Sequence, residues 1–221
     1  MLKTFASLFL VFILSTQLFL SAATAVQYVV AKDAKPAVLL QHQYLCILPT
    51  GEAIMSGSSF PIDSRHLITA AHMKCPEGTI NIVDTNRGYL VEAFPLKIDV
   101  KNDIMLIELR SANETVEGPF ARFRSTPKIG EHVSAYGSAL FGEIETGFYM
   151  EGVVQGFAPW VIFTSANIAP GMSGSALVGD DGKVIGMNIF AMPTFLAFGA
   201  IPWGVVAGAV PSQVIVQFLQ Q

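Results

Sequence analysis

A long succession of short apolar segments, running from Val29 to the carboxyl end, constrains the fold of this chain most strongly. The segments have the length of strands, and they are rich in β-branched and aromatic residues. Examples are HLITAAH (66–72), DIMLIEL (103–109) and KVIGMNIF (183–190), with turn-forming residues such as DDG (180–182) between segments. Many short strands at close spacing predict an all-β sandwich or barrel fold.

The carboxyl end needs separate consideration, because residues 184–221 carry no charge. Pro193, Pro202 and Pro211 interrupt this segment, and proline breaks a membrane-spanning helix. We therefore expect buried strands here, followed by a short helix over QVIVQFLQQ. Ser212, which precedes that segment, is the candidate cap.

The amino end has the pattern of an export signal. A basic start, MLK, precedes an apolar stretch over residues 5–20 and the small residues Ala23-Thr24-Ala25. We interpret residues 1–25 as a cleaved signal peptide, which predicts a secreted or periplasmic protein with no stable membrane insertion after cleavage. The alternative is an uncleaved membrane anchor. Export permits a disulfide, so Cys46 and Cys75 either pair or remain free core residues.

Composition excludes several classes of function. With 52% hydrophobic and 14% charged residues, the 221-residue chain is not intrinsically disordered. Its net charge of −4 gives no sign of a nucleic-acid partner. No metal site and no cofactor are predicted. Residues 111–127 are the least apolar segment and the best candidate for a linker between two halves.

Catalysis by a serine nucleophile needs a base, an orienting acid and an oxyanion hole. All four histidines precede Ser173, which excludes the order Ser, acid, His and leaves the order His, Asp, Ser as an option. His72 ends the strand-like segment LITAAH and is the candidate base. A lone histidine at the start of a loop is more often simply a surface residue, so the hypothesis depends on its partners.

Asp103 stands directly before an apolar strand, where a carboxylate can meet an imidazole Nδ1–H. Asp99 is the competing acid, and we favour Asp103 because the apolar segment begins immediately after it. Ser173 lies in GMSGS, and the amides of Gly171 and Ser173 are the candidate oxyanion donors. A plain glycine-rich turn is the simpler alternative for this motif alone.

Together, TAAH (69–72), DIMLI (103–107) and PGMSGSALV (170–178), followed by DGKVIGMN (181–188), resemble the chymotrypsin-fold serine proteases. The likeness is closest to the HtrA (Deg) branch, through SGSSFPID (56–63) and GVVAGAVPSQVI near the end. The similarity covers essentially the whole mature chain, so we expect no PDZ domain.

The resemblance implies two antiparallel six-stranded β-barrels with a short C-terminal helix. The N-terminal barrel (26–115) would carry the histidine and the aspartate, and the C-terminal barrel (116–221) the serine and the substrate pocket. His72 would be the general base, Asp103 its orienter and Ser173 the nucleophile of a serine endopeptidase that acts on protein or peptide substrates. The pocket residues implied by the resemblance are Asn167, Met187, Asn188, Ile189 and Ala209.

Met172 replaces the acid or amide that the family usually has before the serine, so activation by a new N-terminal ammonium is not supported. Gly57 stands where the first cysteine of the family's common bridge would fall. No acid occurs among the pocket residues, which favours an apolar or small residue before the cleaved bond. The alternative functions are a catalytically silent protein of this fold that binds peptides or partners, and a signal-anchored membrane protein.

Overall fold

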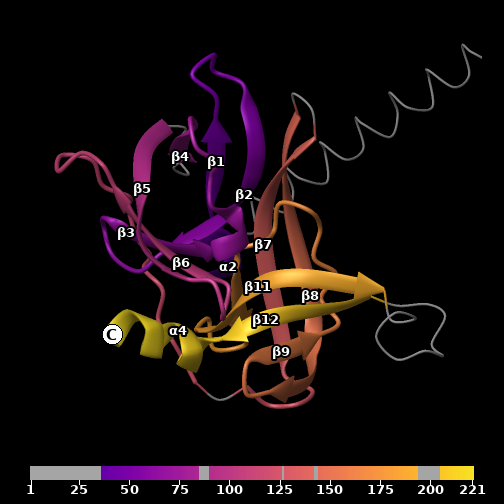
Figure 1. Ribbon diagram of the computed structural model, residues 1–221. Coiled ribbons are helices and arrows are strands. Elements are labelled where there is room, and N and C mark those ends of the chain that lie inside the picture. Colours follow the sequence, from indigo (N-terminus) through magenta and orange to yellow (C-terminus); the bar gives the residue numbers. More distant parts are fainter. Residues whose placement is uncertain (1–35, 85–89, 126, 142–143, 194–204) are drawn as a thin grey trace, which may run out of the picture. The chain divides into compact units, whose positions relative to one another are not determined.

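The computed structural model describes residues 36–84, 90–125, 127–141, 144–193 and 205–221 (Figure 1). The predicted signal peptide, residues 1–25, lies outside these ranges. Within them, no helix is both long enough and apolar enough to cross a membrane.

The first six strands form a closed antiparallel barrel in the order β1-β2-β3-β6-β5-β4. A single 3₁₀ turn, η1 (Ala71–Met73), follows β3. Residues 104–109 of the segment predicted as a strand form β6, which pairs with β3 and β5. The six strands are β1 (His42–Ile47), β2 (Ala53–Pro61), β3 (His66–Ala70), β4 (Ile80–Asp84), β5 (Leu90–Asp99) and β6 (Ile104–Leu109).

The last six strands form a second closed antiparallel barrel in the order β10-β11-β12-β9-β8-β7. Two closed six-stranded barrels confirm the predicted fold class. The strands are β7 (His132–Phe141), β8 (Ile144–Ala158), β9 (Val161–Thr164), β10 (Ala176–Gly179), β11 (Val184–Pro193) and β12 (Val205–Pro211).

Within the described ranges, two α-helices flank the barrels. The short helix α2 (Pro36–Leu39) precedes β1, and a proline at the first helical position is compatible with helix initiation. The C-terminal helix α4 (Ser212–Gln220) is present as predicted, but Ser212 does not cap it. Instead, the Ser212 hydroxyl donates a hydrogen bond of 2.7 Å to the carbonyl oxygen of Arg124.

The two barrels share one buried apolar cluster. Tyr44 and Phe60 of the first barrel belong to the same cluster as Val184 and Met187 of the second. Helix α4 adds Phe218 to it, and the Lys97 ammonium of β5 lies 4.6 Å from the centre of the Phe218 ring. Figure 1 shows β2 next to β7, where the barrels meet. Because the shared core removes apolar surface of both barrels from water, it holds them together.

Candidate active site

Strand pairing brings His72 and Asp103 together. β3 and β6 are neighbours in which Ala70 is opposite Ile104, so the residues just beyond them meet at the rim of the first barrel. One carboxylate oxygen of Asp103 accepts from the His72 backbone N–H at 2.8 Å, and the other lies 2.7 Å from His72 Nδ1. Because an ionised carboxylate only accepts hydrogen bonds, this pair places the imidazole proton on Nδ1 and leaves the Nε2 lone pair available.

A tight turn holds Asp103 in an unusual backbone conformation. Its φ of 57° makes it the single non-glycine residue with a positive φ among those the structure describes, and aspartate tolerates this region better than most residues. Asp99 accepts hydrogen bonds from the Asn102 backbone at 3.1 Å and from its side chain at 2.6 Å. Partial burial raises the pKa of Asp99, but the hydrogen bonds lower it by more, so the pKa lies below its ordinary value. The competing acid therefore fastens the turn before Asp103 and does not bind His72.

Ser173 lies half-buried in the Ser173 loop, defined here as residues 165–175 between β9 and β10. The loop contains a turn in which the Met172 amide donates to the Ala169 carbonyl at 3.0 Å. Pro170 and Gly171 occupy the central positions, and Gly171 has a φ of 92°. This is the pattern of a type II turn, which requires glycine at the third position.

Hydrogen bonds hold the carbonyl groups of Gly171, Met172 and Ser173 in this loop. Ser58 of β2 donates from its hydroxyl to the Gly171 carbonyl at 2.6 Å and from its amide to the Ser173 carbonyl at 2.8 Å. The Met172 carbonyl accepts from the Ser175 amide at 2.9 Å. In contrast, the amides of Gly171 and Ser173 donate to no acceptor within the described part of the chain. Two free N–H groups beside a serine can bind a developing oxyanion.

Gly174 allows the two barrels to approach each other directly behind Ser173. Its φ is 88°, and a Cβ atom at this position would lie 2.1 Å from the Ser58 carbonyl oxygen and 3.0 Å from the Ala70 amide nitrogen. Only glycine fits at position 174. The close approach that it allows places Ser173 beside the end of β3, which leads to His72. No hydrogen bond joins the Ser173 hydroxyl to the His72 ring in the described chain, and such bonds are often long before substrate binds.

The five predicted pocket residues have different environments. Asn167 is exposed, Ile189 is half-buried, and Met187 and Ala209 are fully buried in apolar clusters. Asn188 is fully buried, and its backbone binds the Ser173 loop. Its backbone amide donates to the Ser175 carbonyl at 2.9 Å, and its backbone carbonyl accepts from the Gly174 amide at 2.8 Å. A direct role of these residues in substrate binding stays a prediction.

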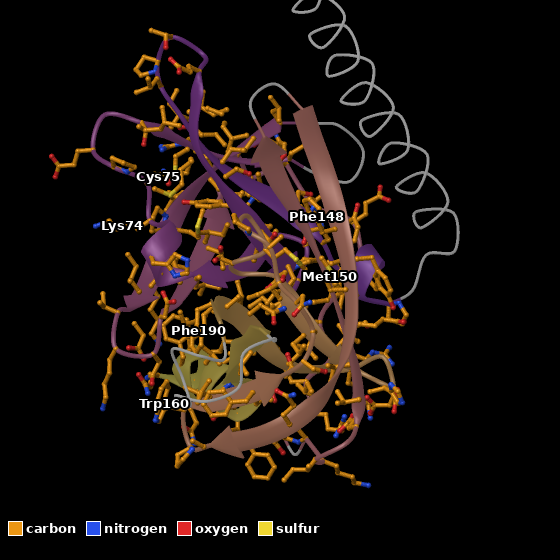
Figure 2. All side chains as sticks on the ribbon, turned by 90° about the vertical axis from the view of Figure 1, so that its right-hand side faces the viewer. Lys74, Cys75, Phe148, Met150, Trp160 and Phe190 are labelled. Atoms are coloured by element: carbon orange, nitrogen blue, oxygen red, sulfur yellow. A yellow bond between two sulfur atoms is a disulfide. The ribbon has the colours of Figure 1, made fainter. Side chains whose placement is uncertain are left out.

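Cys46 and Cys75 form a disulfide (Figure 2 labels Cys75). Cys75 follows the η1 turn that carries His72, so the bond ties this turn to β1. Met73, the residue after His72, covers Gly57, where a Cβ atom would lie 2.4 Å from the methionine methyl group. Apolar packing therefore fills the position at which the family's common bridge would begin.

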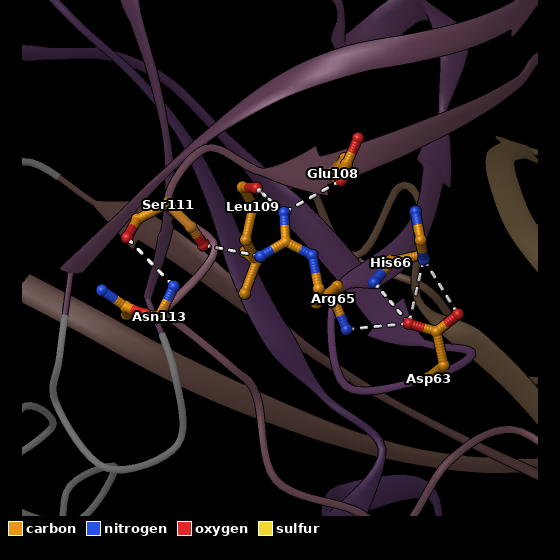
Figure 3. A network of polar contacts seen from close by, with 7 residues as sticks. All are labelled: Asp63, Arg65, His66, Glu108, Leu109, Ser111 and Asn113. Atoms are coloured by element: carbon orange, nitrogen blue, oxygen red, sulfur yellow. Dashed lines mark hydrogen bonds and ion pairs between the residues drawn. The ribbon is translucent and has the colours of Figure 1, made fainter.

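The other histidines lie in different surroundings. His66 contacts both carboxylate oxygens of Asp63, which also accepts from the Arg65 amide at 2.8 Å (Figure 3). These contacts stabilise the turn between β2 and β3 at the surface. His42 is buried in β1, and His132 is exposed at the start of β7. Among the described residues, no group of three or more potential ligands could hold a metal ion.

Sequence reasoning missed Ser58 and the packing of Met172. The available signal for Ser58 was its polar side chain within the buried end of β2. A buried hydroxyl needs a hydrogen-bond partner, and that partner can lie in another element. That partner, the Ser173 loop, follows only from the way the barrels meet. The sequence pattern singled out Met172 as unusual but carried no information about its surroundings.

Comparison with known proteins adds three findings. A family model described as "Trypsin-like peptidase domain" matches residues 57–187. The chain is 30% identical over 179 residues to the serine protease HTRA1A of Danio rerio, which covers 76% of this chain and 35% of that protein. The chain thus spans about a third of that relative's length. The crystal structure of a serine endoprotease from Yersinia pestis superposes with a TM-score of 0.66 at 21% identity, over 84% of this chain and 64% of that one.

Proposed function

The chain belongs to the trypsin-like peptidases, a family of serine endopeptidases, and from this premise we propose that it hydrolyses peptide bonds through an acyl-enzyme. His72 is the general base, Asp103 orients it, and Ser173 is the nucleophile. Protein or peptide chains are the substrates. Both barrels contribute proposed catalytic residues. The N-terminal domain comprises residues 26–115 and the C-terminal domain residues 116–221.

Each proposed step corresponds to a group in the site. Ser173 Oγ attacks the substrate carbonyl carbon while His72 Nε2 accepts the hydroxyl proton. The carbonyl oxygen becomes an oxyanion that accepts hydrogen bonds from the Gly171 and Ser173 amides. His72 then protonates the leaving amine nitrogen as the C–N bond breaks, and a water molecule hydrolyses the resulting ester by the same route.

One observation carries this proposal over a silent, partner-binding role. The carbonyl groups of Gly171, Met172 and Ser173 accept hydrogen bonds, whereas the amides of Gly171 and Ser173 donate to no acceptor among the described residues. A loop with only a structural role has no reason to leave two partly enclosed donors unpaired, since unpaired donors cost free energy. The two hydrogen-bond contacts between His72 and Asp103 support the same assignment.

We extend the proposal to specificity and location. Asn167, Asn188 and Ile189 carry no charge, which favours an apolar or small residue before the cleaved bond over lysine or arginine. The segment 1–25 is proposed to direct export and to be removed. The Cys46–Cys75 disulfide supports an oxidising compartment such as the periplasm or the exterior.

A fluorophosphonate probe tests the activity on the full chain expressed in an exporting host. We expect covalent labelling at Ser173, identified by mass spectrometry of the modified peptide, and no labelling of a folded Ser173→Ala variant. Asp103→Asn should label slowly, because the His72 tautomer is then no longer fixed. Absence of labelling, under conditions that label a reference serine protease, would favour the partner-binding alternative. The mass of the purified chain shows whether residues 1–25 are removed.

A further inference from the structure

Met172 lies in sequence between the two residues whose amides form the proposed oxyanion hole, and its side chain points into the second barrel. It is fully buried, and its neighbours come from strands as well as from the loop itself. Met172 belongs to an apolar cluster: Ala135, Ile168 and Ala207 form its buried part with Met172, and Phe148, Met150 and Ala169 pack against it (Figure 2 labels Phe148 and Met150).

Two further contacts fix the position of this side chain. The Ala169 amide donates a hydrogen bond to Met172 Sδ at 3.2 Å, while the Met172 amide donates to the Ala169 carbonyl at 3.0 Å. The side chain and the backbone of Met172 thus both bind Ala169. On the other side, β7 lies so close that a Cβ atom at Gly137 would come within 2.7 Å of Met172 Cγ and 2.8 Å of its Cα.

We propose that Met172 is an apolar anchor that positions the Gly171 and Ser173 amides as oxyanion donors. It is a positioning residue, because its side chain is enclosed by the barrel and does not reach the reacting atoms. The inference rests on the proposed peptidase activity and deepens it. Met172 is joined to both donor residues by peptide bonds, so any shift of its Cα rotates the two amides.

The anchor requires no ionic partner. An ionised side chain at position 172 would be buried among apolar groups and would need an opposite charge, whereas a thioether can be buried without one. The loop geometry therefore depends on packing inside the second barrel. It follows that this part of the loop geometry comes from packing inside the second barrel, together with the bonds from Ser58 of the first, and needs no charged group at the amino end of the chain.

The rate of Ser173 labelling by a fluorophosphonate tests the anchor, because the phosphoryl oxygen of the probe occupies the oxyanion hole. Removing one oxyanion donor typically costs a factor of ~10²–10³. We expect Met172→Ala, which leaves a cavity beneath the loop, to slow labelling roughly ten- to hundredfold, part of such a loss. Met172→Leu, which keeps the apolar volume, should label within about threefold of the unmodified protein.

Ile185→Ala is the matched control. Ile185 is fully buried in the same barrel but belongs to a different apolar cluster, so its truncation should lower the melting temperature and leave the labelling rate intact. All rates are compared at a temperature where circular dichroism shows each variant to be folded. If Met172→Ala does not fold, Met172→Val provides a smaller truncation with the same expected direction.

The outcomes separate this inference from the proposed function. If the unmodified protein is labelled and a folded Met172→Ala or Met172→Val variant is labelled equally fast, the anchor is refuted and the activity stands. A Met172→Leu variant as slow as Met172→Ala would also refute an anchor based on packing. If Ile185→Ala slows labelling as much as Met172→Ala, the effect is general destabilisation and the anchor is refuted. If the unmodified protein is not labelled, the proposed activity itself fails.

Discussion

Removal of the Cys46–Cys75 disulfide offers the most quantitative test of the structure. The bond joins residues 29 positions apart, and the closed loop includes β2, β3 and the η1 turn with His72. In the chain-entropy model, a loop of this size lowers the entropy of the unfolded state by an amount equivalent to about 3.5 kcal/mol at 25 °C. Both cysteines contact the shared core, so alanine at both positions also costs some packing.

The assay is equilibrium urea unfolding, followed by tryptophan fluorescence with and without a phosphine reductant. We expect the reductant to lower the unfolding free energy of the unmodified protein by about 3.5 kcal/mol. It should leave the Cys46→Ala/Cys75→Ala double variant unchanged. Reduction should also slow Ser173 labelling, because the turn that carries His72 loses its tie to β1.

Two results would refute this reasoning. One is an unchanged unfolding free energy after thiol titration has shown that the disulfide is fully reduced. The other is an equal effect of the reductant on the double variant, which contains no cysteine. Either result would mean that the bond does not constrain the unfolded chain as the loop length implies.

Two further predictions concern a buried histidine and a pair of glycines. Burial lowers the pKa of His42 from 6.5 to about 4, and a backbone contact at Asp84 offsets only part of this effect. The unfolded chain therefore binds the proton first, so stability present above pH 6.5 should fall by about 3 kcal/mol as the pH decreases to 4. His42→Leu should flatten this part of the stability profile measured by urea unfolding, and an unchanged slope would contradict the assignment. Gly174→Ala should cost about 1–3 kcal/mol more than Gly51→Ala in thermal unfolding, since both residues have a positive φ but only Gly174 has atoms within 4 Å of the added Cβ. Equal costs for the two variants would show that the contact with the Ser58 carbonyl does not require glycine.

The sequence predicted strands well where apolar residues form continuous segments, as in β6 and β11. It did not predict β8, the 15-residue strand Ile144–Ala158, because this segment contains glycines that usually indicate turns. The structure shows why they occur inside a strand. A Cβ atom at Gly152 would lie 2.3 Å from the Ala166 amide nitrogen, and one at Gly147 would lie 1.8 Å from the Tyr136 hydroxyl. These approaches depend on tertiary packing and have no local signature.

The same division applies to the candidate site. His72, Asp103 and Ser173 were identified from short local patterns, since each stands at the end of a strand or in a glycine-rich turn. The contacts made by Ser58 and Met172 could not be predicted in this way. Those of Ser58 depend on which surfaces of the two barrels meet, and those of Met172 depend on how the strands of the second barrel close around the Ser173 loop. The Cys46–Cys75 pairing was left open for the same reason: β1 and the η1 turn are distant in sequence, and only the closed barrel brings them together.

The hydrogen bonds from Ser58 to the Ser173 loop affect when the candidate site becomes complete as the chain folds. Ser58 belongs to the first barrel, and it holds the Gly171 and Ser173 carbonyls of the second. A chain in which only one barrel has folded therefore does not bring the proposed nucleophile, Ser173, and the proposed base, His72, together in a fixed arrangement. On the proposed mechanism, newly made or partly unfolded copies would therefore be inactive at the stage when their own exposed chains are easiest to cleave, which would limit self-digestion before assembly is complete.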